Sequence, residues 1–336
     1  MSEQRGKIVF SSGTTNDYDL WSLDMATGRI VQLTHGKAWN DKPCWSPDGT
    51  RVVFTSNRQS KGQNLFWVSA EGGEPTALTN LDLWMDSPAF SPDGSKIAFI
   101  SNEAGNNDVW VMDADGQNRT QVTRHEASDK HARWAADGRG LYFSSDRDDN
   151  DADIWYVDLS TGQTRQINQD GGLDISPTPS PDGQLIAFCS NRQLVADPEK
   201  PFADRDKDIW LMRADGTSPV RLTESQGADF NPCWSPDGTH ILYSASDSKD
   251  VCHLRIVDVS EVVAAFASPD ADAVHHAARR LRHTKVSYDR SEMQAEIGAQ
   301  RHAIFLTSWI PDNWMKGVYP RGYFGQERNA HWVGAS

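Results

Sequence analysis

Histidines and basic residues at matched places in the sequence could do acid–base chemistry or bind an anion. Lys42, His131 and Arg133 each precede a tryptophan by one to three residues, and His331 directly precedes Trp332. Histidine titrates nearest to neutral pH, so His131 and His331 are the candidate general bases. Lys42 and Arg133 can donate charge-assisted hydrogen bonds to a carboxylate, and the guanidinium group can do so with two parallel bonds.

These residues fall on alternate positions of predicted strands that should line a central channel. The aromatic or apolar residue that ends each strand should point between neighbouring units, and alternate residues should then face the channel. The third residue before that position gives the upper ring: Lys42, Ser87, His131, Ser176, Asn231 and Asn329. The residue directly before it gives a second ring: Cys44, Ala89, Arg133, Thr178, Cys233 and His331. We predict ligand contacts from Lys42, Arg133, Asn231 and Asn329; a polar channel that holds only water is the alternative.

Two tryptophans lie in predicted loops between the repeated units. Trp39 and Trp84 precede two neighbouring strands, and the other loops have Ala127, Gly172 and Gly227 at the position we align with them. An exposed aromatic face can stack on a sugar ring or an apolar partner. We therefore include both tryptophans in the predicted binding site. The alternative is that each packs over its own loop.

A repeated turn organises the chain around these candidates. Ser-Pro-Asp-Gly, or a variant of it, follows an aromatic or apolar residue at 45–49, 90–94, 134–138, 179–183 and 234–238. The turn glycines lie 45, 44, 45 and 55 residues apart. A fixed period in this range indicates one recurring supersecondary unit.

Each unit contains four strand signals, which is typical of the blade of a β-propeller. We predict an all-β fold, a six-bladed propeller formed as a single domain over 1–336, with seven blades as the alternative. The segment 329–334 resembles the first strand of a blade and should close the ring beside Lys7–Phe10. Helical spacing after Ser268 predicts a helical insertion over 261–303 in the sixth blade, and 304–308 should be an outer strand.

The Trp-Ser-Pro-Asp-Gly turns, with the Ile-Ala-Phe and Asp-Ile-Trp strands, resemble the TolB-like propeller family, also called the WD-like PD40 repeat. The resemblance covers about 7–258. It implies relatives that include partner-binding propellers, oligogalacturonate lyases and the propeller domains of certain serine peptidases. In those lyases a histidine-rich closing blade holds a metal, whereas the predicted closing strand here offers only His331.

Composition limits the partners. The formal net charge of −14 and the pI near 5.1 argue against nucleic acid or an anionic membrane. The N-terminal residues enter the first strand with no apolar segment, so we expect a cytoplasmic protein, or a periplasmic one whose leader has been removed. Cys44 and Cys233 occupy the same place in different blades and are not expected to pair.

Further candidates arise where the chain departs from its repeat. The acidic run 146–153 lacks the glycine and glutamate of a calcium loop, so we expect no cofactor, with calcium there as the alternative. The enlarged loop 192–207 would lie on the face that carries the loops between blades, as a binding element or a tolerated insertion. The helical insertion packs on the ring or makes a homodimer contact.

The sequence therefore predicts a module that binds a ligand or a protein on its loop-bearing face, with an acidic carbohydrate as the favoured small ligand. One alternative is a carbohydrate-active enzyme, a lyase or hydrolase acting on an acidic oligosaccharide. Another is a scaffold for protein assembly.

Overall fold

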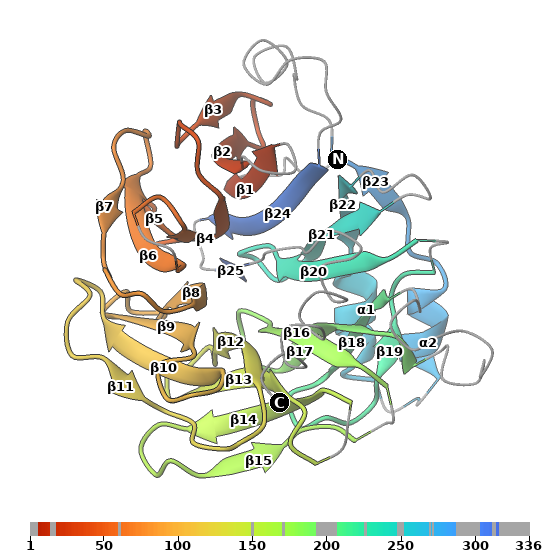
Figure 1. Cartoon of the computed structure of the whole chain (residues 1–336). Helices are drawn as coiled ribbons and strands as arrows, with labels where there is room; N and C mark the ends of the chain where they lie inside the picture. The colour runs from red at the N-terminus through yellow and green to blue at the C-terminus, as the bar shows by residue number, and fades with distance from the viewer. Residues whose placement is uncertain are drawn as a thin grey trace.

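Six antiparallel sheets surround a common axis and form the blades of a propeller in the computed structural model (Figure 1). The structure describes residues 6–13, 18–59, 62–148, 151–169, 172–192, 207–224, 227–246, 252–268, 270, 272–286, 303–310 and 314–315. The predicted all-β, six-bladed architecture is confirmed. Inner strands of neighbouring blades contact one another around the whole ring.

The blades follow one another in chain order. Blade two consists of β4 (Asn40–Trp45), β5 (Arg51–Ser56), β6 (Asn64–Ser69) and β7 (Thr76–Ala77). Blade three consists of β8 (Met85–Phe90), β9 (Lys96–Ser101), β10 (Asp108–Asp113) and β11 (Thr120–Gln121). Blade four consists of β12 (Asp129–Trp134), β13 (Gly140–Ser145), β14 (Asp153–Asp158) and β15 (Thr164–Gln166). Blade five consists of β16 (Asp174–Pro179), β17 (Leu185–Ser190), β18 (Asp208–Arg213) and β19 (Val220–Arg221).

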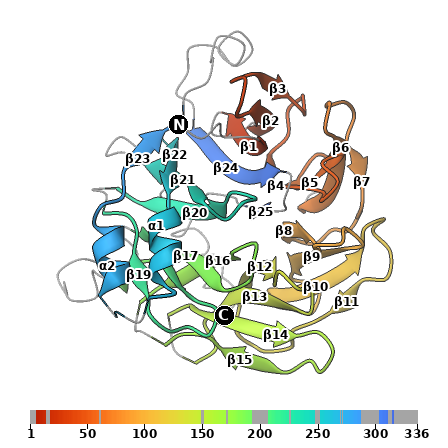
Figure 2. The same cartoon turned by 180° about the vertical axis from the view of Figure 1, so that it is seen from behind.

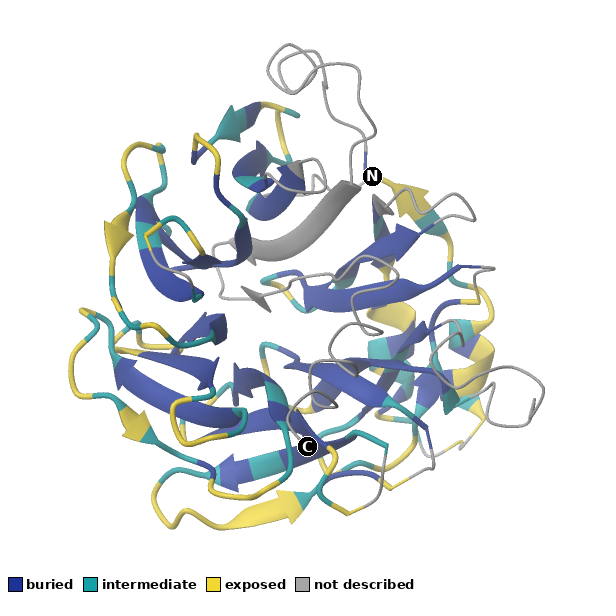
Figure 3. Cartoon of the chain, viewed as in Figure 1, coloured by how far each residue is buried: buried dark blue, intermediate teal, exposed yellow. Residues whose placement is uncertain are grey.

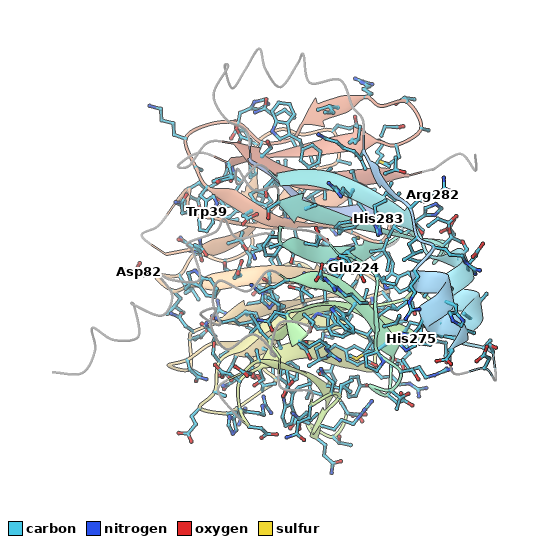
Figure 4. All side chains as sticks on the ribbon, turned by 90° about the vertical axis from the view of Figure 1, so that its right-hand side faces the viewer. Trp39, Asp82, Glu224, His275, Arg282 and His283 are labelled. Carbon is cyan, nitrogen blue, oxygen red and sulfur yellow. The ribbon has the colours of Figure 1, made fainter. Side chains whose placement is uncertain are left out.

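Blade six begins with β20 (Asp229–Trp234), β21 (His240–Ser246) and β22 (Cys252–Asp258), and its outer strand is β23 (His283–Lys285). Between β22 and β23 lie the helices α1 (Ser260–Ala265) and α2 (Ala273–Ala278). Val262 and Phe266 pack in one cluster with Leu222 of the stretch that follows β19, so the helices also contact blade five. They lie toward the face opposite to Trp39 (Figure 4). The helix expected near Ser291 falls outside the described residues.

Ring closure differs from the prediction. Blade one contains β1 (Lys7–Gly13), β2 (Tyr18–Asp24) and β3 (Ile30–Gln32), and its inner strand is β24 (Ala303–Ile310), which pairs with β1 from Lys7 to Gly13. A short strand, β25 (Trp314–Met315), pairs with β24. Figure 2 shows β24 between β1 and the centre of the ring. The predicted outer strand at 304–308 is therefore the closing strand. The predicted closing segment, 329–334, lies outside the described residues.

The repeated turn is held by its own side chains. In blade two, Ser46 Oγ donates to Asp48 Oδ1 at 2.5 Å, and the backbone N–H of Thr50 donates to the same oxygen at 3.0 Å. Gly49 lies in the left-handed region with φ 67°, which a side chain would strain. Asp and Gly recur at fixed spacing in all five turns and Ser in four of them, and this recurrence produces the sequence repeat.

A second recurring contact joins the third strand to the threonine that follows the fourth strand in blades one, two, three and five. Thr79 Oγ1 donates to Asn64 Oδ1 at 2.9 Å and accepts from the backbone N–H of Leu65 at 2.9 Å. Thr34 and Asp19 make the same contact in blade one at 2.9 Å. This contact explains the acidic or amide residue and the distant Thr in these four repeats.

The core lies between the blades. Val9 and Leu20 of blade one pack with Trp45, Phe54 and Phe66 of blade two, and all five side chains are fully buried. Figure 3 shows the inner strands β4, β8, β12, β16 and β20 mostly buried, and exposed residues on the outer strands β7, β11, β15 and β23. Each inner strand therefore holds its channel residues on a rigid base.

Candidate functional site

The predicted upper ring coincides with a backbone irregularity that recurs in the inner strands. Lys42, Ser87, His131, Ser176 and Asn231 all have positive φ, between 53° and 56°. Each lies at a register shift between the inner strand and its neighbour, which marks a β-bulge. A non-glycine residue in this conformation costs on the order of 1–3 kcal/mol, and such residues gather at functional sites. The repeated bulge marks the channel as the candidate site.

Neighbouring ring members contact one another. Ser176 Oγ donates to Asn231 Oδ1 at 3.1 Å across the boundary between blades five and six. In the second ring, Thr178 Oγ1 donates to the carbonyl oxygen of Pro232 at 3.2 Å. These contacts confirm that Asn231 belongs to the same ring as the other described members. Asn329 and His331 lie outside the described residues, so their assignments stay predictions.

Lys42 lies in a buried cluster of charges that includes two carboxylates. Its Nζ is 3.9 Å from Asp86 Oδ2 of blade three, and both side chains are almost fully buried. Asp41 accepts a hydrogen bond from Ser11 Oγ of blade one at 2.6 Å. Burial raises the pKa of Asp41, an effect that Lys42 and the bond from Ser11 oppose. The charge of Lys42 is therefore already partly balanced.

Arg133 belongs to the second ring and is buried, with only 6% of its surface exposed. Its Nη1 donates to the carbonyl oxygen of Ala132 at 2.7 Å. Burial lowers the pKa of Arg133 to about 10, while Cys44, Cys233 and Asp86 act in the opposite direction. The guanidinium group therefore remains charged at neutral pH. Burial also raises the pKa of Cys44 to about 12, so this thiol stays protonated.

His131 lies two residues from Arg133 on β12 and is 5% exposed. Both side chains belong to blade four, and Lys42 belongs to blade two. The structure thus places the predicted base and the predicted cations on inner strands of one ring. Blade three lies between the blade that carries Lys42 and the blade that carries His131.

Trp39 lies at the loop-bearing face, by which we mean the face that carries the loops between blades, and Asp82, two residues before Trp84, lies at the same face (Figure 4). Trp39 is half-buried and packs on Tyr18, with ring centroids 6.4 Å apart. Trp84 is half-buried beside Leu81 and Leu83, and Asp82 between these leucines is exposed. Each tryptophan keeps part of its ring accessible.

In the loops before blades four, five and six, the residues equivalent to Trp39 and Trp84 lie one position later than predicted from the sequence. The backbone N–H groups of Trp39 and Trp84 donate to the Asn57 and Asn102 side chains, each at 2.9 Å. The residues that make the corresponding backbone contact in blades four, five and six are Ser128, Leu173 and Ala228. Ala127, Gly172 and Gly227 are therefore not the equivalents of the tryptophans. Ser128 and Ala228 are nevertheless much smaller than the tryptophans at the equivalent positions.

Sequence reasoning missed the carboxylates of Asp41 and Asp86. Both directly precede an upper-ring residue, at a position where strand alternation predicts a side chain that faces away from the channel. Asp41 and Asp86 reach back to the preceding blade, where they accept from Ser11 and Thr55 at 2.6 and 3.5 Å. The signal in the sequence was an acidic residue at the same place in two successive blades.

The acidic run offers no sign of a calcium loop in its described part. Asp146 Oδ1 accepts from the backbone N–H of Ser128, and Asp153 Oδ2 accepts from Gln166 Nε2, both at 2.9 Å. These are the structural roles of the repeat. Across the described residues the structure has no cluster of His, Cys, Asp or Glu that could hold a metal ion, and no helix long and apolar enough to cross a membrane. Cys44, Cys189 and Cys233 are buried free thiols.

The fold and the bulged inner strands define a six-bladed propeller built from Pro-Asp-Gly repeats. Residues 76–195 match the family model of the TolB β-propeller domain, PD40. This match confirms the predicted resemblance to the TolB-like propeller family for that part of the chain.

Similar proteins share parts of this chain. An uncharacterized protein from Agrobacterium fabrum is 29% identical over 224 residues, which are 65% of this chain and 70% of that protein. The Tol-Pal system protein TolB from Francisella tularensis subsp. mediasiatica is 26% identical over 237 residues, which are 68% of this chain but only 52% of that protein. The crystal structure of TolB from Acinetobacter baumannii has a TM-score of 0.66 and 20% identity, and the match covers 90% of this chain and 67% of that one. The last similarity shows the fold.

Proposed function

We propose that this chain is a protein-binding propeller whose partner docks on the loop-bearing face, over the half-buried rings of Trp39 and Trp84. The observation that carries the proposal is the loop 81–84, where Leu81, Leu83 and Trp84 are all partly accessible in one short segment. Tryptophans that are fixed and partly accessible are the residue type that most often dominates a protein interface.

The loop backbone is held in place before any partner arrives. Asn64 Nδ2 donates to the carbonyl oxygen of Leu81 at 2.7 Å, and the N–H of Gln63 donates to that of Leu83 at 3.0 Å. A Cβ on Gly62 would lie 2.1 Å from the Leu83 carbonyl oxygen, so only glycine allows this close approach. A fixed loop loses little conformational freedom on binding, which favours affinity.

Charge indicates the chemistry of the partner. The protein carries a formal net charge of −14, so its long-range potential repels acidic molecules and attracts basic ones. Lys42 is already beside Asp86, which weakens its attraction for a further carboxylate. We therefore favour a partner segment with an apolar or aromatic side chain and basic flanks. The similarity to TolB, named as a Tol-Pal system protein, supports a partner-binding role.

A small acidic ligand in the channel is the second candidate, because Arg133 and Lys42 lie in the bulged rings. A lyase or hydrolase activity would require such a ligand, with His131 as its base. We also propose the cytoplasm as the location and α1 with α2 as the surface for any homodimer.

Titration calorimetry with peptides and uronate oligomers tests both candidates. The peptides vary in aromatic and basic content, and the variants are Trp84→Ala, Arg133→Thr and a control, Trp67→Ala. Trp67 is also half-buried, but it lies near the opposite end of blade two, and Thr178 occupies the Arg133 position in blade five. We expect Trp84→Ala to weaken the best basic aromatic peptide about 30-fold, since a hot-spot aromatic contributes roughly 2 kcal/mol or more.

Trp67→Ala and Arg133→Thr should leave that peptide affinity within about twofold. Equal losses for Trp84→Ala and Trp67→Ala would contradict the docking surface. If uronate oligomers bind and Arg133→Thr weakens them while Trp84→Ala does not, the channel is the binding site instead.

A further inference from the structure

A cavity of about 430 Å³ lies between blades four and five, where the repeated turn is degenerate. Its lining includes Ala136, Asp137, Tyr142, Tyr156, Arg165 and Asp182. The inner strand β12 runs from the inter-blade loop at one end to the turn 135–138 at the other. The cavity therefore lies at the face opposite to Trp39 and Trp84, and it is separate from the proposed docking surface.

The turn beside the cavity lacks the proline that the other turns have. Elsewhere the turn proline of one blade packs toward the turn glycine of the next, and a Cβ on Gly94 would lie 3.2 Å from Pro47 Cδ. Gly238 and Pro181 show the same arrangement at 3.7 Å. In blade four the proline is replaced by Ala136, whose Cβ would lie 3.3 Å from a Cβ on Gly183. The pyrrolidine ring that packs there in other blades is absent.

Two tyrosines line the opened space. Tyr142 is 6% exposed and lies with Tyr156 at a ring-centroid distance of 5.0 Å and an interplanar angle of 57°. The paired positions in the other blades hold one aromatic residue at most: Val53 with Trp67, Ala98 with Val111, Ala187 with Leu211 and Leu242 with Ile256. A Cβ on Gly140 would lie 2.3 Å from the Tyr156 hydroxyl, so glycine makes room for this ring. The proline loss, the glycine and the aromatic pair occur together in one blade.

The charges at the rim favour a cation. Arg165 places its guanidinium carbon 5.0 Å from the centroid of Tyr156, so one ring already attracts a cation from within the chain. Asp137 and Asp182 lie on either side of the blade boundary and are exposed. Burial raises the pKa of both tyrosines, and Asp137 contributes to each shift. The phenol rings are therefore neutral at neutral pH, and carboxylates lie near them.

We propose that this cavity binds an organic cation of the guanidinium or alkylammonium class, with its charge over the tyrosine rings and against Asp137 and Asp182. Aromatic faces attract such cations, and carboxylates at the rim strengthen the attraction. The ligand takes the place of the Arg165 guanidinium at Tyr156. Its source is either a free amine or an Arg or Lys side chain of another protein.

The test uses N-acetyl-arginine amide as the cation and N-acetyl-citrulline amide as its uncharged counterpart. Affinity is measured by titration calorimetry, and the signal of 3-fluorotyrosine at position 156 reports the place of binding by ¹⁹F NMR. Ala136→Pro restores the turn of the other blades and fills the cavity, and Pro92→Ala is the control at the equivalent turn of blade three. Arg165→Gln removes the internal cation.

For the arginine amide we expect a dissociation constant on the order of 1 mM and at least tenfold weaker binding of the citrulline amide. Ala136→Pro should weaken the arginine amide about tenfold or more, Arg165→Gln should tighten it about threefold, and Pro92→Ala should change nothing. If a Gly-Arg-Gly peptide binds more tightly than the arginine amide, the ligand is a side chain of another protein. If the two bind equally, the ligand is a free cation.

Three results would overturn the assignment: equal affinity for the arginine and citrulline amides, unchanged binding by Ala136→Pro, or no shift of the Tyr156 signal at a concentration of about 20 mM.

Discussion

Arg147 offers a direct test of how a blade holds its inner strand in place. Its Nη2 donates to both carboxylate oxygens of Asp129 at 3.0 and 3.1 Å, and its Nε donates to Ser145 Oγ at 3.0 Å. The guanidinium carbon also lies 4.6 Å from the centroid of Trp155. Asp129 begins the strand that carries His131 and Arg133, and its side chain is fully buried.

The magnitude follows from burial. Removing one partner of a buried ion pair leaves the other charge without compensation, at a cost of about 3–5 kcal/mol, and loss of the cation–π contact adds roughly 1 kcal/mol. Arg147→Met should therefore lower the free energy of unfolding by about 4 kcal/mol or more. Blade three shows how the chain avoids this cost, since Met85 and Glu103 occupy the positions of Asp129 and Arg147.

The assay is urea unfolding of the wild type, Arg147→Met, Asp129→Met and the double variant. The double variant leaves no uncompensated carboxylate, so it should be more stable than Arg147→Met by at least about 2 kcal/mol. The fraction of folded protein is followed by tryptophan fluorescence and circular dichroism, whose transitions should coincide. A loss below about 1 kcal/mol for Arg147→Met, or additive effects in the double variant, would refute this reasoning.

Two further predictions concern acid–base linkage and ring closure. Burial raises the pKa of Asp174 to about 6, even though Arg192 contacts it at 2.6 Å. The folded protein therefore retains this proton while the unfolded chain loses it, and the resulting stability is lost as the pH rises from 4.5 to 7. Across that interval urea unfolding should show Asp174→Asn gaining about 2 kcal/mol relative to the wild type, and a constant difference would contradict the shift. Because β24 already pairs with β1 along its length, deletion of residues 329–336 should leave the melting temperature unchanged. A large drop in the melting temperature, or aggregation, would instead favour closure of the ring by 329–334.

The fold could be predicted because its turns depend on particular side chains. Ser46, Asp48 and Gly49 hold the turn through their own hydrogen bonds and backbone conformation, so the Asp and Gly recur in every turn and the Ser in most of them. The closing strand makes no such turn. Pairing of β24 with β1 uses backbone groups, which require no particular residue types. The closing strand was therefore predicted at 329–334, where the sequence around Trp332 resembles a first strand.

The candidate site was predictable only in part for a related reason. Alternation along a strand correctly grouped Ser176 with Asn231, which the structure joins by a hydrogen bond. Alternation assumes a regular strand, however, and the bulge at Lys42 interrupts β4. The partners that balance Lys42 lie in the next blade, at Asp86, and beside it in the chain, at Asp41. Contacts across a blade boundary depend on packing that one sequence does not reveal.

The two proposed sites use opposite ends of the same architecture. At the loop-bearing face, Gln63 and Asn64 hold the loop that carries Trp84 through hydrogen bonds to its backbone. At the other face, the turn of blade four has Ala136 in place of proline, and the cavity lies beside it. A partner over Trp84 and a cation beside Tyr156 would contact different blades. Because the two sites lie on different blades and at opposite faces, we expect the two binding events to be independent, with little coupling free energy between them.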